Sequence, residues 1–228
     1  MKKLIAFVAI IMLFQACRKG DADNQQPCQD YFYKYYQGKK DTIGMISPQY
    51  VLIGLQDGAS ADEVKTLISA KDYVDPTYNF QVFETTPTPG KERIAFLRLK
   101  SAQTCNDLRL ILSDLSGSTL IALANPTIQA ADCNSLIEFV TLGKKCVYYY
   151  TNLFHVKVKD ANDLSDLNQL AESTGTTIGE RSRYNPDIFE MLTNKNSKGD
   201  AFEMANYFYE SGLFVWSEPG FGKYGVEK

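Results

Sequence analysis

The sequence predicts an α+β protein made of two similar halves, each with the element order β-α-β-β-α-β, behind an N-terminal β-hairpin. Two observations support this prediction. Apolar residues recur in alternating blocks at helical and at strand-like spacing. A unit of helix, stop and short apolar run also occurs twice. In both copies the proline that closes the run lies six positions after the leucine that opens it, Leu120 to Pro126 and Leu213 to Pro219.

The second copy, Gly199 to Phe221, is the better defined. Asp200 and Glu203 have the spacing of a capping box at a helix start. Gly212 favours the left-handed conformation in which helices end. The apolar run that follows, Leu213 to Trp216, has the length and composition of a strand.

The other elements follow from the same signals. Ser60 and Glu63 form a second capping box, and Thr104 with Asp107 starts a further helix that ends at Gly117. Gly175 ends the remaining helix. The strands expected in addition are Tyr50 to Leu55, Phe80 to Glu84, Arg93 to Leu99, Leu153 to Val158, Thr176 to Arg181 and Ile188 to Leu192.

This element order is that of the ferredoxin-like fold, in which two helices cover one face of a four-stranded antiparallel sheet. The fold class is therefore α+β, with tandem ferredoxin-like repeats and an N-terminal β-hairpin. The expected organisation along the chain is a signal peptide (1–17), a spacer (18–27), a Tyr-rich hairpin (28–46), a first repeat (47–132), a connector (133–150), a second repeat (151–221) and a C-terminal tail (222–228). Whether Leu136 to Leu142 of the connector is strand or helix stays open.

Two segments carry a resemblance to a known family. The run Glu203 to Phe214, EMANYFYESGLF, followed by Glu218-Pro219, resembles the end of the N-terminal pro-region of bacterial secreted subtilisin-like serine peptidases. The Tyr-rich start, Tyr31 to Tyr36, is similar to the opening of the same pro-regions. The resemblance implies a ferredoxin-like fold and a chain that binds such a peptidase. It departs from the family in that no Asp, His and Ser catalytic domain follows before Lys228.

The N-terminus predicts export and lipid anchoring. Lys2 and Lys3 precede the eleven apolar residues Leu4 to Phe14, and Cys17 follows as the lipid-accepting residue. Eleven residues are too few to span a bilayer, which needs about 20. We therefore expect a lipoprotein of the cell envelope, held by its N-terminal lipid at the outer membrane or cell surface rather than at the inner membrane.

The charge balance argues against nucleic acid as a partner. The 228 residues carry a formal net charge of −3, and removal of the signal would leave 22 basic against 27 acidic residues. Binding to phosphate backbones relies on clustered Lys and Arg. The composition, 44% hydrophobic and 22% charged, is that of an ordinary globular protein.

Export makes the other four cysteines candidates for disulfides, and four cysteines allow three connectivities. In the expected fold Cys105, at a helix start, and Cys133, beyond the following strand, lie at one end of the first repeat. We therefore predict the pairs Cys105 with Cys133 and Cys28 with Cys146, with free thiols as the alternative.

The search for chemistry predicts no enzyme, no metal and no cofactor. His155 is the single histidine, and it alternates with Phe154 and Val156 inside an expected strand. The sequence contains no Gly-x-Ser-x-Gly nucleophile elbow, and the cysteines lack the close companions of a zinc site.

A protein-binding surface is better supported. If Val156 and Val158 face the helices, then His155 and Lys157 point to the open sheet face, where Phe214 and Trp216 are expected beside them. The resemblance adds the tail, in which Tyr224 or Val226 would fill pockets of a peptidase by strand addition. The alternative is that these aromatic residues are core and that the tail is a frayed terminus.

Together these features predict a non-catalytic lipoprotein that binds another exported protein, through which it would inhibit a subtilisin-like peptidase or assist its folding. The alternatives are a surface adhesion or assembly protein that uses the same scaffold and an enzyme of unrecognised type.

Overall fold

The structure is a computed structural model that describes residues 26–84, 92–135 and 140–227. The predicted signal peptide with Cys17 and most of the predicted spacer lie outside these ranges, as do residues 136–139 of the connector.

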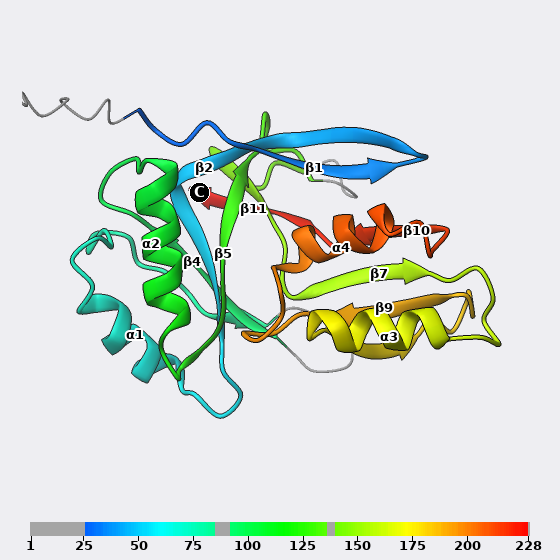
Figure 1. Cartoon of the computed structure of the whole chain (residues 1–228). Coiled ribbons are helices and arrows are strands. Elements are labelled where there is room, and N and C mark those ends of the chain that lie inside the picture. The colour runs from blue at the N-terminus through cyan, green and yellow to red at the C-terminus, as the bar shows by residue number, and fades with distance from the viewer. Residues whose placement is uncertain (1–25, 85–91, 136–139, 228) are drawn as a thin grey trace, which may run out of the picture.

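The described part of the chain is a mixed α+β protein with two sheets and four helices. Its strands are β1 (Tyr31–Tyr36), β2 (Lys39–Leu55), β3 (Phe83–Glu84), β4 (Arg93–Arg98), β5 (Ile121–Gln129), β6 (Lys145–Tyr149), β7 (Leu153–Lys157), β8 (Thr177–Arg181), β9 (Ile188–Leu192), β10 (Trp216–Pro219) and β11 (Gly222–Glu227). Its helices are α1 (Ala61–Ser69), α2 (Cys105–Ser116), α3 (Ser165–Thr174) and α4 (Ala201–Glu210). The sheets lie side by side (Figure 1).

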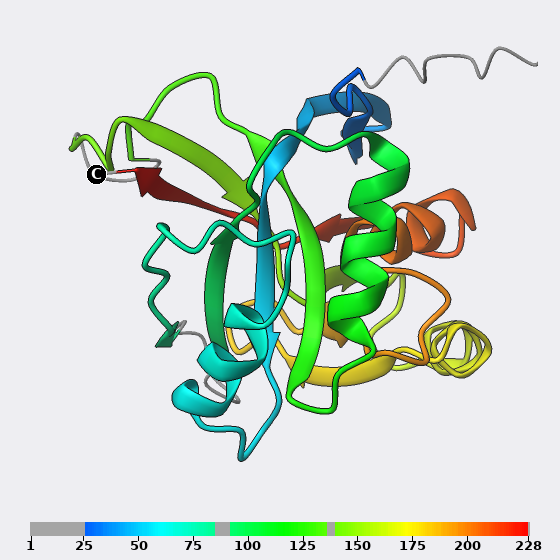
Figure 2. The same ribbon diagram turned by 90° about the vertical axis from the view of Figure 1, so that its left-hand side faces the viewer.

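The first sheet has the strand order β11-β6-β5-β2-β4-β3, and β1 pairs with β2 outside this path. Helices α1 and α2 lie over one of its faces (Figure 2). Val64 and Ile68 of α1 and Leu108, Ile111 and Leu115 of α2 pack there with alternate residues of β2 and β4. The predicted capping box of Ser60 and Glu63 begins α1. We call β2 to β5, with these helices, the first unit.

The second sheet has the order β10-β7-β9-β8, and α3 and α4 cover one of its faces. Phe154 and Val156 of β7 and Met191 of β9 pack against α4 through Phe202 and Phe208. Asp200 and Glu203 form the predicted capping box, while Gly175, with φ +68°, ends α3. We call β7 to β10, with these helices, the second unit.

The hairpin joins the two units instead of standing before them. Strand β2 has 17 residues and runs without a break across the expected boundary at residue 46. Its partner β1 lies above α4 (Figure 1), where the Asn206 side chain donates to the Tyr33 carbonyl at 2.9 Å. Phe32 packs against the rings of Tyr150 and Phe202, with centroids 5.5 and 5.0 Å away. The β1–β2 hairpin, which belongs to the first sheet, therefore completes the core of the second unit.

The C-terminal segment returns to the first sheet, so the predicted free tail is wrong. Strand β11 pairs antiparallel with β6, a strand of the expected connector. Tyr224 stacks on Phe96 at 4.4 Å and on Phe83 at 4.9 Å, and Val226 is 5% exposed. The physical reason is that the face of β2 and β4 opposite the helices is apolar, and Tyr224 and Val226 cover it.

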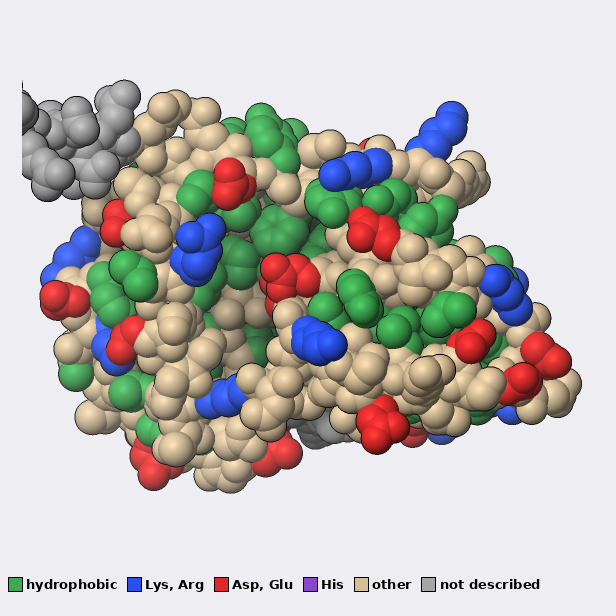
Figure 3. Space-filling view, in the orientation of Figure 1, with side chains coloured by type: hydrophobic (Ala, Val, Ile, Leu, Met, Phe, Trp, Pro, Cys, Tyr) green, Lys and Arg blue, Asp and Glu red, His purple; other side chains and the backbone are tan. Residues whose placement is uncertain are grey.

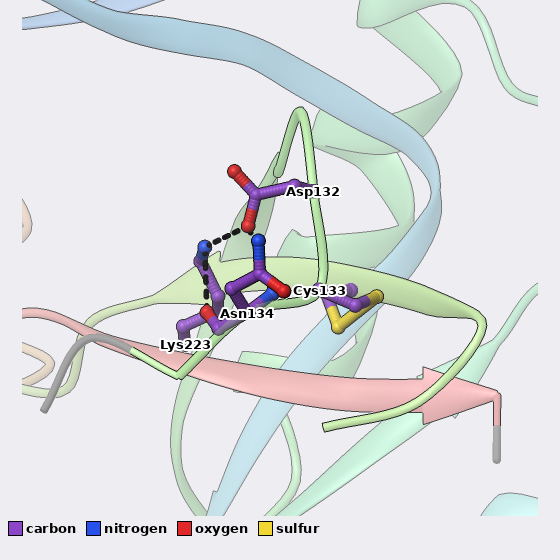
Figure 4. The surroundings of a disulfide bond; sticks show 5 residues. Asp132, Cys133, Asn134 and Lys223 are labelled. Carbon is purple, nitrogen blue, oxygen red and sulfur yellow. Dashed lines mark hydrogen bonds and ion pairs between the residues drawn. A yellow bond between two sulfur atoms is a disulfide. The ribbon is translucent and has the colours of Figure 1, made fainter. Parts of the chain in front are cut away.

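The disulfides also differ from the predicted pairs. Cys28 bonds Cys105, because the segment before β1 lies along the start of α2, where the Cys28 amide donates to the Gln103 carbonyl at 2.9 Å. Cys133 bonds Cys146 instead, since the connector folds back on β6 (Figure 4). The expected neighbours, Cys105 and Cys133, belong to different bridges.

The second bridge lies next to a buried cation. Lys223 of β11 donates from Nζ to Asp132 Oδ1 and to the Asn134 carbonyl, both at 3.0 Å (Figure 4). The Lys223 side chain is 4% exposed and its Nζ lies 5.0 Å from the Tyr148 ring centroid. The connector is thus held to β11 by the ion pair of Asp132 with Lys223 and to β6 by the Cys133–Cys146 disulfide.

Candidate protein-binding face and inter-unit cleft

The face of the second sheet away from α3 and α4 is its partly exposed side. Along β7 and β9 buried residues alternate with partly exposed ones, and the cross-strand register places the exposed set on one face. We call this set the open face. It consists of Leu153, His155 and Lys157 of β7, Ile188, Glu190 and Leu192 of β9, and Trp216 and Glu218 of β10.

His155 lies on the open face as predicted, in a row between two carboxylates. Its cross-strand partners are Glu190 on β9 and Glu218 on β10. Burial lowers the pKa of His155, and the two carboxylates oppose this shift. Glu218 in turn forms an ion pair with Lys34 of β1, whose Nζ lies 3.0 Å from Glu218 Oε2. His155 is therefore a neutral, partly buried member of a mixed-charge row at pH 7.

Lys157 and Trp216 form the next row of the open face. They are direct cross-strand partners, and Ile188 flanks Lys157 on its other side. Val215, just before β10, is 50% exposed. An indole in one row with an aliphatic side chain suits a protein interface, because Trp is enriched in such interfaces.

Three of the predicted binding residues lie elsewhere. Phe214 precedes β10, is 6% exposed and stacks on Phe208 of α4 at 5.5 Å. Tyr224 and Val226 lie in the first sheet, as described above. Of the six predicted residues, the structure brings together His155, Lys157 and Trp216. Sequence patterning missed Glu190 and Glu218, although the alternation in Ile188 to Leu192 was a signal for the first of them.

A cleft of about 900 Å³ lies between the two units, and the surface is hollowed there (Figure 3). The first unit contributes the end of β2, the start of β4 and part of β5. The second unit contributes Leu153, Glu190 and Leu192 and the loop that leads to α4. Because these three residues also belong to the open face, the face and the cleft are continuous.

The floor of the cleft is polar and buried. Asn125 donates to the carbonyls of Tyr150 and Thr151 at 3.1 and 3.3 Å, which joins the units. Asn152 donates to the Thr193 carbonyl at 3.2 Å, but its buried Oδ1 accepts no hydrogen bond within the described part of the chain. Asp200 accepts from the buried Tyr150 hydroxyl at 2.7 Å. Burial raises the pKa of Asp200 to about 6.

No sequence signal pointed to this cleft, because its walls come from separate stretches of the chain that meet only when the units pack. Among the described residues the one group close enough to hold a metal ion is Cys28, Asp30 and Cys105, and its two cysteines form a disulfide. Within the same residues, no helix is long and apolar enough to cross a membrane.

Comparisons with known proteins assign no family. No model of a known protein family matches the chain, and no curated protein matches it. Among solved structures, the small subunit of acetolactate synthase from Thermotoga maritima aligns over 78% of this chain and 92% of its own, at 12% identity and a TM-score of 0.28. That value is too low to carry an argument about fold or function.

Proposed function

We propose that this protein is a non-catalytic binding module that recognises another exported protein through the open face of its second sheet. The observation that carries the proposal is the row of Ile188, Lys157 and Trp216, which are cross-strand neighbours on the partly exposed face. This face contrasts with the corresponding face of the first sheet, where Tyr50, Leu52 and Phe96 are at most 2% exposed. A partly exposed sheet face that places Trp216 and Ile188 among charged side chains suits a protein partner.

The proposed scaffold is a pair of ferredoxin-like repeats. In support, both units have the order β-α-β-β-α-β, and in both sheets the strands follow the order fourth, first, third, second within the unit. The added strands β1, β6 and β11 distinguish the first sheet from the second.

The proposed location is the cell envelope, with a lipid on Cys17 as the anchor. Support comes from the charged and apolar pattern of residues 1–17 and from the two disulfides, since disulfides persist in oxidising compartments. Cysteine substitution tests the anchor: Cys17→Ser should move the protein from the membrane fraction to the soluble fraction and abolish labelling by a fatty-acid analogue.

The first partner to consider is a subtilisin-like serine peptidase, on the resemblance of Glu203 to Pro219 and of Tyr31 to Tyr36 to peptidase pro-regions. Inhibition by a tail inserted into the peptidase cleft is not part of the proposal, because β11 is a sheet strand. The built-in β11 favours the second candidate, a surface adhesion or assembly protein that binds through the open face alone.

The test uses the Cys17→Ser protein, titrated against purified exported subtilisin-like peptidases and followed by residual activity and by calorimetry. We expect a complex that Lys157→Glu or Trp216→Ala weakens at least about tenfold, the effect of losing one interface hot spot. Leu110→Ala is the matched control, because Leu110 is exposed at 63% on α2.

A complex that survives both substitutions would remove the open face from the proposal. If none of the peptidases binds, the peptidase is removed as partner. The second candidate then requires that cells lacking the protein lose a surface attachment, and that the wild-type chain but not Trp216→Ala restores it.

A further inference from the structure

The β1–β2 hairpin presents aromatic rings to solvent. Tyr31 is 61% exposed and Tyr36 is 51% exposed, although both belong to a sheet strand. The strand between them is fixed to the second unit, because Tyr35 stacks on Tyr209 of α4, with ring centroids 4.4 Å apart, and donates its hydroxyl to Glu210 at 2.8 Å. The exposed rings therefore stand on a packed base. A tyrosine side chain suits a boundary that is apolar on one side and wet on the other.

The same hairpin is basic in a chain that is acidic overall. Residues 31–46 contain three lysines and one aspartate, a net charge of +2, whereas the 228 residues together carry −3. Lys39 and Lys40 are exposed at the tip, where Lys39 is the cross-strand partner of Tyr36. The third lysine, Lys34, is held by an ion pair with the second unit. Two exposed cations therefore lie beside an exposed ring.

The hairpin lies on the side of the molecule where the described chain begins. Strand β1, the first part of β2 and residue 26 all lie along the upper side in Figures 1 and 2, and basic side chains project from that side at the hairpin end (Figure 3). Cys28 is bonded to Cys105 and lies eleven positions after Cys17. Eleven residues reach at most about 40 Å. A lipid on Cys17 therefore keeps this side of the molecule close to the bilayer.

We propose that the β1–β2 hairpin lies on the bilayer that holds the lipid of Cys17, with Lys39 and Lys40 against anionic phospholipid headgroups. Tyrosine is enriched at the boundary between headgroups and acyl chains, and each lysine near an anionic surface strengthens binding about fivefold. The tether makes this contact intramolecular, so a weak contact suffices. The acidic remainder of the chain opposes it little, because charges more than about 10 Å away are screened. The inference rests on the proposed anchor and adds the orientation of the protein.

This orientation leaves the open face accessible. Helices α3 and α4 cover the opposite face of the second sheet and lie in front of it in Figure 1, so the open face points away from the viewer and not toward the upper side. The ion pair of Lys34 with Glu218 joins β1 to the edge of that face. A partner that binds through Lys157 and Trp216 therefore approaches along the membrane surface.

The test measures which lysines a membrane protects. The chain from residue 17 onward is coupled through the Cys17 thiol to a maleimide lipid, in vesicles of phosphatidylcholine with or without phosphatidylglycerol. A water-soluble reagent then acetylates the lysines, and peptide mass spectrometry gives the rate at each. Lys39 and Lys40 should react at least about fivefold more slowly when phosphatidylglycerol is present. Lys65 and Lys198, which are exposed outside the hairpin, are internal controls and should keep their rates. High salt should remove the protection.

Tyrosine substitutions test the part played by the rings. Tyr31→Ser combined with Tyr36→Ser should cut the protection of Lys39 and Lys40 to about twofold or less. Tyr184→Ser is the matched control, because Tyr184 is 100% exposed and lies outside the hairpin, and it should leave the protection unchanged. Equal acetylation of the two hairpin lysines on both kinds of vesicle, or equal effects of the two tyrosine variants, would overturn the inference.

The outcomes separate this inference from the proposed function. Chemical coupling places the chain on vesicles whether or not cells attach a lipid to Cys17. If Lys39 and Lys40 stay reactive while Lys157→Glu weakens a protein complex, the hairpin inference alone fails. If the vesicles protect Lys157 instead of the hairpin lysines, the open face lies on the membrane and both proposals fail.

Discussion

Replacement of Tyr224 by alanine should destabilise the first unit strongly, although the residue lies near the end of the chain. Its ring stacks on both Phe96 and Phe83, with interplanar angles of 6° and 12°. Each aromatic pair contributes about 1 kcal/mol beyond area burial. The partly buried ring removes on the order of 100 Å² of apolar surface from water, about 2.5 kcal/mol. We expect Tyr224→Ala to lower the free energy of unfolding by about 4.5 kcal/mol.

The assay is equilibrium unfolding in urea, followed by circular dichroism, with the shift in midpoint read at constant slope. The control is Tyr184→Ala, because Tyr184 is 100% exposed and should change stability by less than about 0.5 kcal/mol. If the two tyrosine variants unfold at the same urea concentration, β11 is not part of the folded sheet and the argument against a free tail fails.

Three further predictions follow from contacts described above. The pKa of Asp200, about 6, lies above the usual carboxyl value near 4, so the folded state binds this proton more tightly than the unfolded state does. This difference stabilises the folded state by up to about 3 kcal/mol at low pH, and the contribution is lost as the pH rises from 4 through 6. Asp200→Asn should remove this pH-dependent contribution. Urea unfolding of the wild-type and Asp200→Asn proteins at pH 4 and pH 7 measures it as the difference in the free energy of unfolding. The Cys28–Cys105 bridge spans a sequence separation of 77 and Cys133–Cys146 one of 13, so the paired serine substitutions should cost about 4.5 and about 3 kcal/mol. Peptide mapping under non-reducing conditions tests the pairing itself. Phe32→Ala should lower the free energy of unfolding by about 3 kcal/mol. It should also speed amide hydrogen exchange in α4, although Phe32 belongs to β1. Unchanged exchange in α4 would show that the hairpin does not stabilise the second unit.

The elements that local signals define were predictable from the sequence. The capping boxes at Ser60 and Asp200 and the glycine at 175 depend on residues within one helical turn, and the structure has them where they were expected. Strand β9 spans the predicted Ile188 to Leu192. The placement of His155 and Lys157 on one face also follows from alternation, because side chains along a strand point to opposite sides in turn.

The features that depend on distant partners were not predictable in this way. A pairing such as Tyr224 with Val147 joins residues far apart in sequence, and nothing in the local pattern of Gly222 to Glu227 states which strand it will meet. The same holds for Cys28 and Cys105, since their proximity follows from how residues 26–30 lie along the start of α2. Phe214 was misplaced because its run is apolar on both sides, and burial then does not identify a face.

The return of the C-terminal strand β11 to the first sheet, after the whole second unit, constrains how the protein folds. Strand β11 is synthesised after every element of the second unit, yet its neighbour β6 belongs to the first sheet. Until Gly222 to Glu227 emerge, the aromatic surface around Phe96 faces solvent and the rim of β6 lacks its outer neighbour. The nascent chain therefore exposes an apolar sheet face and an unpaired strand edge until these last residues are synthesised. Partly folded states of this kind are prone to aggregation and are the ones that chaperones bind.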